Sequence, residues 1–109
     1  MDWQTISTTL QEIESLLAEA EDPGVEIIAH LRAELTAANN ASALTMLTSG
    51  NLWNHMGSFF DRSLSDRVLD RRFRRAQIRL ADALEAAGAA SPDVTQWAAI
   101  LRSWEAQGL

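Results

Sequence analysis

Three polar side chains near the middle of the chain are of the types that hydrolytic chemistry uses. His55, Ser58 and Asp61 lie three residues apart and could act as base, nucleophile and orienting carboxylate. Nothing in this spacing requires the three side chains to meet, and the Gly-x-Ser-x-Gly pattern of a nucleophile elbow does not surround Ser58. We interpret the segment as a structural turn or a recognition loop and predict no catalytic residue.

A second candidate is a metal site on a predicted helix. Glu26, His30 and Glu34 follow one another at a spacing of four, so a helix places them on one face. Two carboxylates and an imidazole could bind a metal ion there. No second cluster of histidines or carboxylates is obvious nearby. This face is therefore predicted to be solvated, and the sequence predicts neither a metal nor an organic cofactor.

The basic residues are all arginines, and four of them form a row on one predicted helix. The row comprises Arg67, Arg71, Arg75 and Arg79. It could bind phosphates or an acidic partner. It could also face the acidic half of the same domain, or water, and the net charge of −6 favours this alternative. Asp70 and Arg74 have the order that favours an ion pair along a helix.

The negative charge is concentrated in the first half of the chain. Residues 1–60 contain eight acidic residues and one arginine, a balance of −7, whereas residues 61–109 contain seven and eight, a balance of +1, so the sum is −6. An acidic balance disfavours nucleic-acid binding and favours encounter with a basic protein. The predicted acidic binding surface comprises Glu12, Glu14, Glu19, Glu26 and Glu34.

Length and composition exclude several further classes of protein. A chain of 109 residues accommodates one domain, here residues 1–109, and the absence of cysteine excludes disulfides, thiolate metal sites and a cysteine nucleophile. The acidic N-terminus is unlike a secretory signal, and no apolar run is long enough for a bilayer span. We therefore expect a cytoplasmic protein that does not enter a membrane.

Apolar residues recur at spacings of three and four along most of the chain, which is the period of an α-helix. The predicted helices cover residues 3–21, 23–38, 41–48, 66–87 and 92–107. The predicted N-caps are Asp2, Asp22, Ser65 and Ser91, and the predicted stops include Asn39, Gly50, Gly88 and Gly108. The expected fold is all-α, a compact bundle of four main helices plus one short helix, with Trp3, Trp97 and Trp104 in the core.

Residues 51–64 are the least periodic part and mix large apolar side chains with turn formers. Ser58 and Asp61 form a weak capping box for a single helical turn. Trp53, Met56 and Phe59 lie outside any clear period. They are either core residues or an apolar anchor for a partner, and both interpretations remain open.

The segment at residues 56–61, Met-Gly-Ser-Phe-Phe-Asp, precedes an Arg-rich helix. It resembles a Met-Gly-Ser-Phe-x-Asp segment in a group of small bacterial proteins of unknown function, over about residues 44–105. Some members of that group are suspected to be immunity proteins of secreted toxins, and no catalytic residues are assigned to them. The resemblance implies a non-enzymatic protein that occludes the basic active site of a cognate toxin. The alternatives are a homodimer that uses the arginine row, and a small hydrolase or metal protein around His55 or His30.

Overall fold

The chain folds into α-helices joined by short connections. The computed structural model describes residues 2–36, 40–53 and 58–109, and no β-strand occurs among them. The helices are α1 (Trp3–Glu19), α2 (Val25–Thr36), α3 (Asn40–Leu47), α4 (Gly50–Trp53), α5 (Arg67–Ala86) and α6 (Pro92–Ala106). Only Thr48 and Ser49 separate α3 from α4, so these two form one short bent segment beside four longer helices. The predicted fold class is confirmed.

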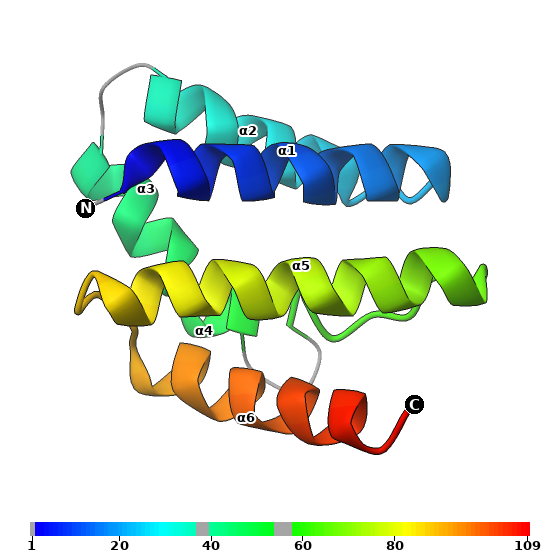
Figure 1. Cartoon of the computed structure of the whole chain (residues 1–109). Coiled ribbons are helices and arrows are strands. Elements are labelled where there is room, and N and C mark those ends of the chain that lie inside the picture. Colours follow the sequence, from blue (N-terminus) through cyan, green and yellow to red (C-terminus); the bar gives the residue numbers. More distant parts are fainter. Residues whose placement is uncertain (1, 37–39, 54–57) are drawn as a thin grey trace.

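The long helices are stacked in layers (Figure 1), with α1 and α2 together, α5 next to them, and α6 beyond α5. In agreement with this view, α1 packs against α2 and α5, α5 packs against α6, and α4 packs against α6. The radius of gyration is 12.9 Å, and a compact domain of this length is expected to have about 13 Å. None of the described helices is long and apolar enough to span a bilayer.

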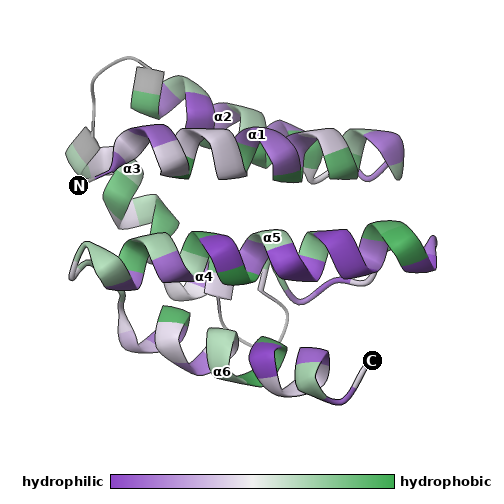
Figure 2. Cartoon of the chain, in the orientation of Figure 1, coloured by the Kyte–Doolittle hydropathy of each residue, from purple (hydrophilic) through white to green (hydrophobic). Residues whose placement is uncertain are grey.

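Each long helix contributes one apolar stripe to a shared core. On α1 the buried stripe includes Ile6, Leu10, Ile13 and Leu17, as the spacing of three and four predicts. The predicted stripe of α5 is likewise buried at Leu69, Phe73, Ala76, Leu80 and Leu84. Hydrophobic and hydrophilic turns alternate along α5 in Figure 2, which reflects its one-sided burial.

Aromatic rings fill the centre of the core. Trp53 packs edge-on against Phe60 with ring centroids 4.7 Å apart, and Phe60 lies 6.0 Å from Phe73. Trp97 is buried as predicted, but Trp104 is 38% exposed, so its prediction as a core residue is wrong. Trp104 instead forms an edge-to-face contact with Trp97, with ring centroids 5.8 Å apart.

Two of the predicted N-caps are confirmed. The Asp2 carboxylate accepts a hydrogen bond from the Thr5 N–H at 3.1 Å, and the Ser91 hydroxyl accepts one from the Val94 N–H at 3.3 Å. For α5 the cap is Asp66, not Ser65, because the Asp66 carboxylate accepts from the first free N–H groups of the helix. The helix therefore begins one residue later than its predicted start.

Two other helix boundaries differ from the prediction. Gly50 does not end a helix; it begins α4, because the Ser49 carbonyl accepts from the Leu52 and Trp53 N–H groups and this further turn buries both side chains. At the start of α2, Pro23 lies in a turn, and the helix itself begins at Val25. The predicted break at Asn39 lies outside the described residues.

Glu105 joins α5 to α6. Its two carboxylate oxygens accept hydrogen bonds from the Nε atoms of Arg74, at 3.0 Å, and Arg75, at 2.6 Å. The bond from Arg75, aided by that from Arg74 and opposed by partial burial, lowers the pKa of the Glu105 carboxyl below its ordinary value of 4.5.

We predict that Glu105→Gln lowers the free energy of unfolding at neutral pH by up to about 1 kcal/mol. A lowered pKa in the folded state stabilises the protein above pH 4.5, and this contribution is lost as the pH falls through the folded-state pKa. Urea unfolding at several pH values should therefore show the variant and the wild type converging in acid. A difference that stays constant with pH would mean that the Glu105 charge is not involved.

Candidate functional site

The predicted acidic surface is divided by the fold into paired and unpaired carboxylates. Glu12 forms an ion pair with Arg79 of α5 at 2.5 Å, and Glu14 forms one with Arg32 of α2. Glu34 lies 3.8 Å from His30 within α2. The Glu12 and Glu14 carboxylates therefore join α1 to its two neighbours. They are less available to a partner than the sequence suggested.

The unpaired carboxylates gather where α1 turns into α2. Glu19 and Glu26 are exposed, as predicted, and they form no ion pair within the described part of the chain. Glu21, which the sequence analysis did not select, is also exposed between them and equally unpaired there. We call these three residues the acidic corner. The signal that could have identified Glu21 is the run of three acids within residues 19–22, just before a proline.

Two residues of the acidic corner, Glu19 and Glu21, are unfavourable for the fold, whereas Glu26 lies in the first turn of α2, where the helix dipole favours negative charge. Glu19 and Glu21 lie at the C-terminal end of α1, where the helix dipole disfavours negative charge and no basic residue occupies the last turn. Glu21 has a φ of 56°, in the left-handed region that glycine adopts with little strain. The left-handed Glu21 closes α1, because its N–H donates to the Ala18 carbonyl at 3.1 Å and the Asp22 N–H donates to the Leu17 carbonyl at 2.8 Å. Glycine would form the same cap with less strain, and the Glu19 and Glu21 carboxylates form no ion pair among the described residues.

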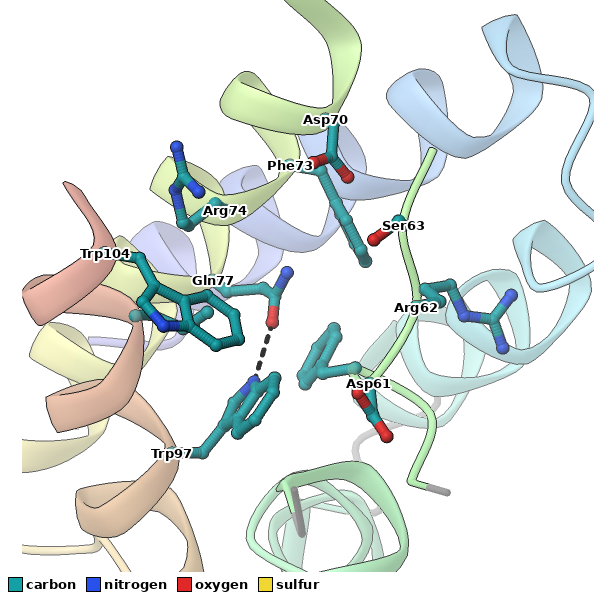
Figure 3. A pocket seen from close by; sticks show the side chains of 11 residues that line it. Asp61, Arg62, Ser63, Asp70, Phe73, Arg74, Gln77, Trp97 and Trp104 are labelled. Atoms are coloured by element: carbon teal, nitrogen blue, oxygen red, sulfur yellow. Dashed lines mark hydrogen bonds between the residues drawn. The ribbon is translucent and has the colours of Figure 1, made fainter. Parts of the chain in front are cut away.

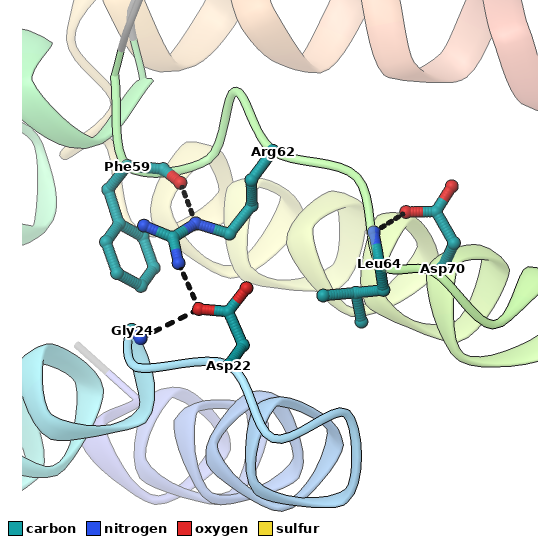
Figure 4. Close-up of polar contacts among 6 residues, drawn as sticks. All are labelled: Asp22, Gly24, Phe59, Arg62, Leu64 and Asp70. Atoms are coloured by element: carbon teal, nitrogen blue, oxygen red, sulfur yellow. Dashed lines mark hydrogen bonds and ion pairs between the residues drawn. The ribbon is translucent and has the colours of Figure 1, made fainter.

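The remaining acid of this turn, Asp22, is neutralised by Arg62 (Figure 4). Arg62 lies on the segment of residues 58–66, here called the strap, which joins α4 to α5. Its Nη1 donates to the Asp22 carboxylate and its Nε donates to the Phe59 carbonyl at 2.7 Å, while its guanidinium lies 4.2 Å from the centroid of the Phe59 ring. The same Asp22 oxygen accepts from the Gly24 N–H at 2.8 Å. The strap is thereby fixed beside the acidic corner.

The predicted apolar anchor is not at the surface. Trp53 is 1% exposed, so it is a core residue and its prediction as an anchor is wrong. Phe59 is 8% exposed, so it does not project from the surface as an anchor, although it lines an apolar hollow beside Ile27. Both pack against Phe60 because the strap folds back over the core. Met56, the third predicted anchor, lies outside the described residues.

The arginine row is largely engaged within the domain. Arg71 donates to the Gly108 carbonyl at 3.1 Å, Arg75 to Glu105, and Arg79 pairs with Glu12. Arg67 is exposed at the first position of α5. This arrangement agrees with the internal alternative that the charge balance favoured.

The predicted pair between Asp70 and Arg74 is not formed. Asp70 accepts from the Leu64 N–H at 2.8 Å, as Figure 4 shows, and Arg74 binds Glu105. Contacts with residues distant in the sequence have thus replaced the ion pair that was predicted along the helix. Asp70 thus ties the end of the strap to α5, whereas Arg74 ties α5 to α6.

The histidine hypotheses receive no support from the described residues. Among them, no three His, Asp or Glu side chains are grouped so that they could hold a metal ion. His55 lies outside this part of the chain. The hydroxyl of Ser58 is buried and has no hydrogen-bond partner there, so the predicted capping by Ser58 is not formed.

Gly24 leaves the space that the Arg62 guanidinium occupies. A Cβ atom at this position would lie 3.0 Å from the Arg62 Cζ and closer still to its Nη1. We predict that Gly24→Ala lowers the free energy of unfolding by about 1–2 kcal/mol, because the guanidinium must leave Asp22. In the Arg62→Ala background the same change should cost at least about 1 kcal/mol less. Equal costs in both backgrounds, measured by urea unfolding, would show that Arg62 is not what limits the space.

The strain at Glu21 can be separated from its charge. We predict that Glu21→Gly raises the free energy of unfolding by about 1 kcal/mol, because glycine accepts a positive φ. Glu21→Gln keeps the strain and removes only the charge, so it should give a few tenths of a kcal/mol. Equal gains from the two variants would contradict the presence of strain at this position.

Comparison with known proteins gives no relative of this chain. No protein-family model matches the sequence, and no curated protein and no solved structure matches it significantly. The geometry of the acidic corner and of its surroundings is therefore the basis for the functional proposal.

Proposed function

We propose that this protein is a non-enzymatic binding domain that docks onto a basic protein through the acidic corner. The observation that carries the proposal is the placement of Glu19 and Glu21 at the C-terminal end of α1, where negative charge is unfavourable and where glycine would adopt the left-handed cap at position 21 with less strain. Side chains that lower stability at a position where another residue would serve the fold better are characteristic of functional surfaces. A basic partner supplies the compensating charge that the domain itself does not provide.

An apolar surface next to the acidic corner supports the same proposal. Ile27 follows Glu26 on α2 and is 47% exposed. It lines an apolar hollow of about 370 Å³ together with Leu31, Met46 and Leu52. Protein interfaces combine an apolar centre with a charged rim. Ile27 thus takes the anchoring role that was predicted for Trp53, and the buried Phe59 lines the same hollow.

The kind of partner proposed is a toxin whose active site is basic, which the acidic corner would occlude. The resemblance of residues 56–61 to small proteins suspected of toxin immunity favours this partner. The homodimer alternative is weaker, because Arg71, Arg75 and Arg79 already bind groups within the same domain.

The test compares two variants of equal net charge. Glu19→Gln with Glu26→Gln, and Thr95→Arg with Gln96→Arg on the exposed face of α6, each change the charge from −6 to −4. The tagged protein first recovers its partner from cells that express its own gene together with the genes next to it. Association rates are then measured at low and high salt.

We predict that the double glutamine variant associates about tenfold more slowly at low salt, whereas the α6 variant changes little, because only the first removes charge from the contact surface. The difference should shrink at high salt. Equal slowing in both variants would mean that net charge, not the acidic corner, governs the encounter. A partner without a basic surface would overturn the proposal.

A further inference from the structure

The apolar hollow beside Ile27 is lined by α2, by the bent segment of α3 and α4, and by the strap. Its buried lining residues are Leu31, Leu52 and Phe59, whereas Ile27 is 47% exposed and Met46 is half-buried. Core side chains therefore close the hollow on its inner side, and solvent reaches it past Ile27 and Met46. Its volume of about 370 Å³ lies in the range of pockets that hold a ligand, roughly 300–1,000 Å³.

The hydroxyl groups that line the hollow already have acceptors. The Thr45 hydroxyl donates to the Ala41 carbonyl at 3.0 Å, and the Ser49 hydroxyl donates to the Met46 carbonyl at 3.1 Å. An apolar group that enters the hollow therefore leaves neither donor unpaired. Met46 adds a flexible thioether, which adapts to apolar side chains of different shapes. The lining thus suits apolar side chains.

Carboxylates flank the hollow on the α2 side. Glu34 lies three residues after Leu31 and seven after Ile27, so the helix places it on the same side as these two. Its side chain is partly exposed and lies 3.8 Å from His30. Glu26 of the acidic corner directly precedes Ile27. The hollow therefore has acidic neighbours near both ends of α2.

The arginines of the surrounding elements are paired with carboxylates. Arg32 of α2 pairs with Glu14 of α1, and Arg62, whose guanidinium lies 4.2 Å from the centroid of the Phe59 ring, pairs with Asp22. The helices α3 and α4 contain no charged residue, and none of the described residues that line the hollow is charged. The α2 carboxylates therefore favour a cationic partner at the rim and repel an anionic one.

The backbone around the hollow favours a helix as the element that docks. Most of the lining belongs to helices, whose N–H and C=O groups bond within the helix, and the Phe59 N–H of the strap donates to the Asn51 carbonyl at 2.8 Å. The described part of this surface thus offers an added strand no free edge. A helix satisfies its own backbone and requires only side-chain contacts.

We infer that the basic partner docks through an amphipathic helix whose apolar side chains enter the hollow, an inference that rests on the proposed function. Apolar residues of this helix, spaced three and four apart, contact Ile27, Met46 and Phe59. Its basic residues lie toward Glu26 and Glu34. The acidic corner then guides the encounter, and the hollow holds the partner once it has docked.

A peptide of about 18 residues tests this inference, with leucines on one helical face and arginines and lysines on the other. Its binding can be followed by NMR in protein with labelled isoleucine and methionine methyl groups. We expect the Ile27 and Met46 signals to shift saturably, with a Kd in the micromolar to millimolar range, while that of Ile78 in α5 stays unchanged. Absence of a saturable shift at Ile27 and Met46 would overturn the inference.

Two control peptides test the required charge and pattern. Replacement of every basic residue by glutamate, and a scrambled order of the same residues, should each weaken binding at least about tenfold. Equal binding of either control would overturn the inference. So would Ile27 signals that shift with protein concentration in the absence of peptide, because a second copy of the chain would then occupy the hollow.

Substitutions at two exposed apolar positions locate the contact. Ile27→Ser removes apolar surface from the hollow and should weaken binding of the basic peptide about five- to tenfold. Val68→Ser is the matched control, because Val68 is 63% exposed on α5 and lies outside the hollow, and it should leave binding unchanged. Ile27→Leu keeps an apolar side chain and should bind within about twofold of the wild type. Unweakened binding in folded Ile27→Ser protein would contradict the assigned contact.

The recovered partner separates this inference from the proposed function. Ile27→Ser should raise the dissociation rate of the partner about fivefold and leave its association rate nearly unchanged, whereas Glu19→Gln with Glu26→Gln slows association. An unchanged dissociation rate in Ile27→Ser, together with slowed association in the double variant, would overturn the docked helix and leave the acidic corner as the contact. Unchanged rates in both variants would overturn both proposals.

Discussion

The contact between Arg62 and Asp22 connects the two halves of this small domain. The strap contains no helix, so its own backbone provides little rigidity, and its position depends on the side chains that it buries and on this ion pair. Arg62 binds the strap carbonyl of Phe59 and the α1–α2 turn at the same time. Arg62 also lines a cavity between α5, α6 and the strap (Figure 3), so one guanidinium borders both the α1–α2 turn and this cavity. Loss of the contact with Asp22 is therefore expected to change the position of the strap beside the acidic corner.

The distribution of charge follows from how the arginines are used. Arg32, Arg75 and Arg79 each pair with a glutamate on another helix, so much of the positive charge serves packing between helices. No basic side chain among the described residues pairs with the acidic corner, although Arg62 neutralises the adjacent Asp22. Three carboxylates without an ion pair in the described part of the chain, Glu19, Glu21 and Glu26, are therefore close together at the α1–α2 turn. Such a localised potential guides encounter with a basic surface better than the same charge spread evenly would do.

Periodicity and local capping chemistry predicted the all-α fold, the stripes of α1 and α5, and the caps at Asp2 and Ser91, because these depend on neighbours in the sequence. Contacts between distant residues account for what was missed. Gly50 is typical of a helix end, yet burial of Leu52 and Trp53 against α6 continues the helical path into α4. Asp70 was predicted to pair with Arg74, but the strap and α6 supply other partners. The positive φ of Glu21 could not be predicted from the sequence, in which a run of acids was the one signal at this position.

Gln77 and Glu21 show why local reasoning does not reach contacts between distant residues. An apolar residue at the buried position of Gln77 would leave the Trp97 indole N–H without an acceptor, so the glutamine oxygen has a structural purpose. Its partner lies on α6, and the neighbours of Gln77 in the sequence do not indicate it. The left-handed backbone of Glu21 also has a structural role, because it closes α1, but glycine would serve that role with less strain. Capping therefore accounts for the backbone of Glu21 and not for its carboxylate, which lies at the surface where a basic partner supplies the compensating charge.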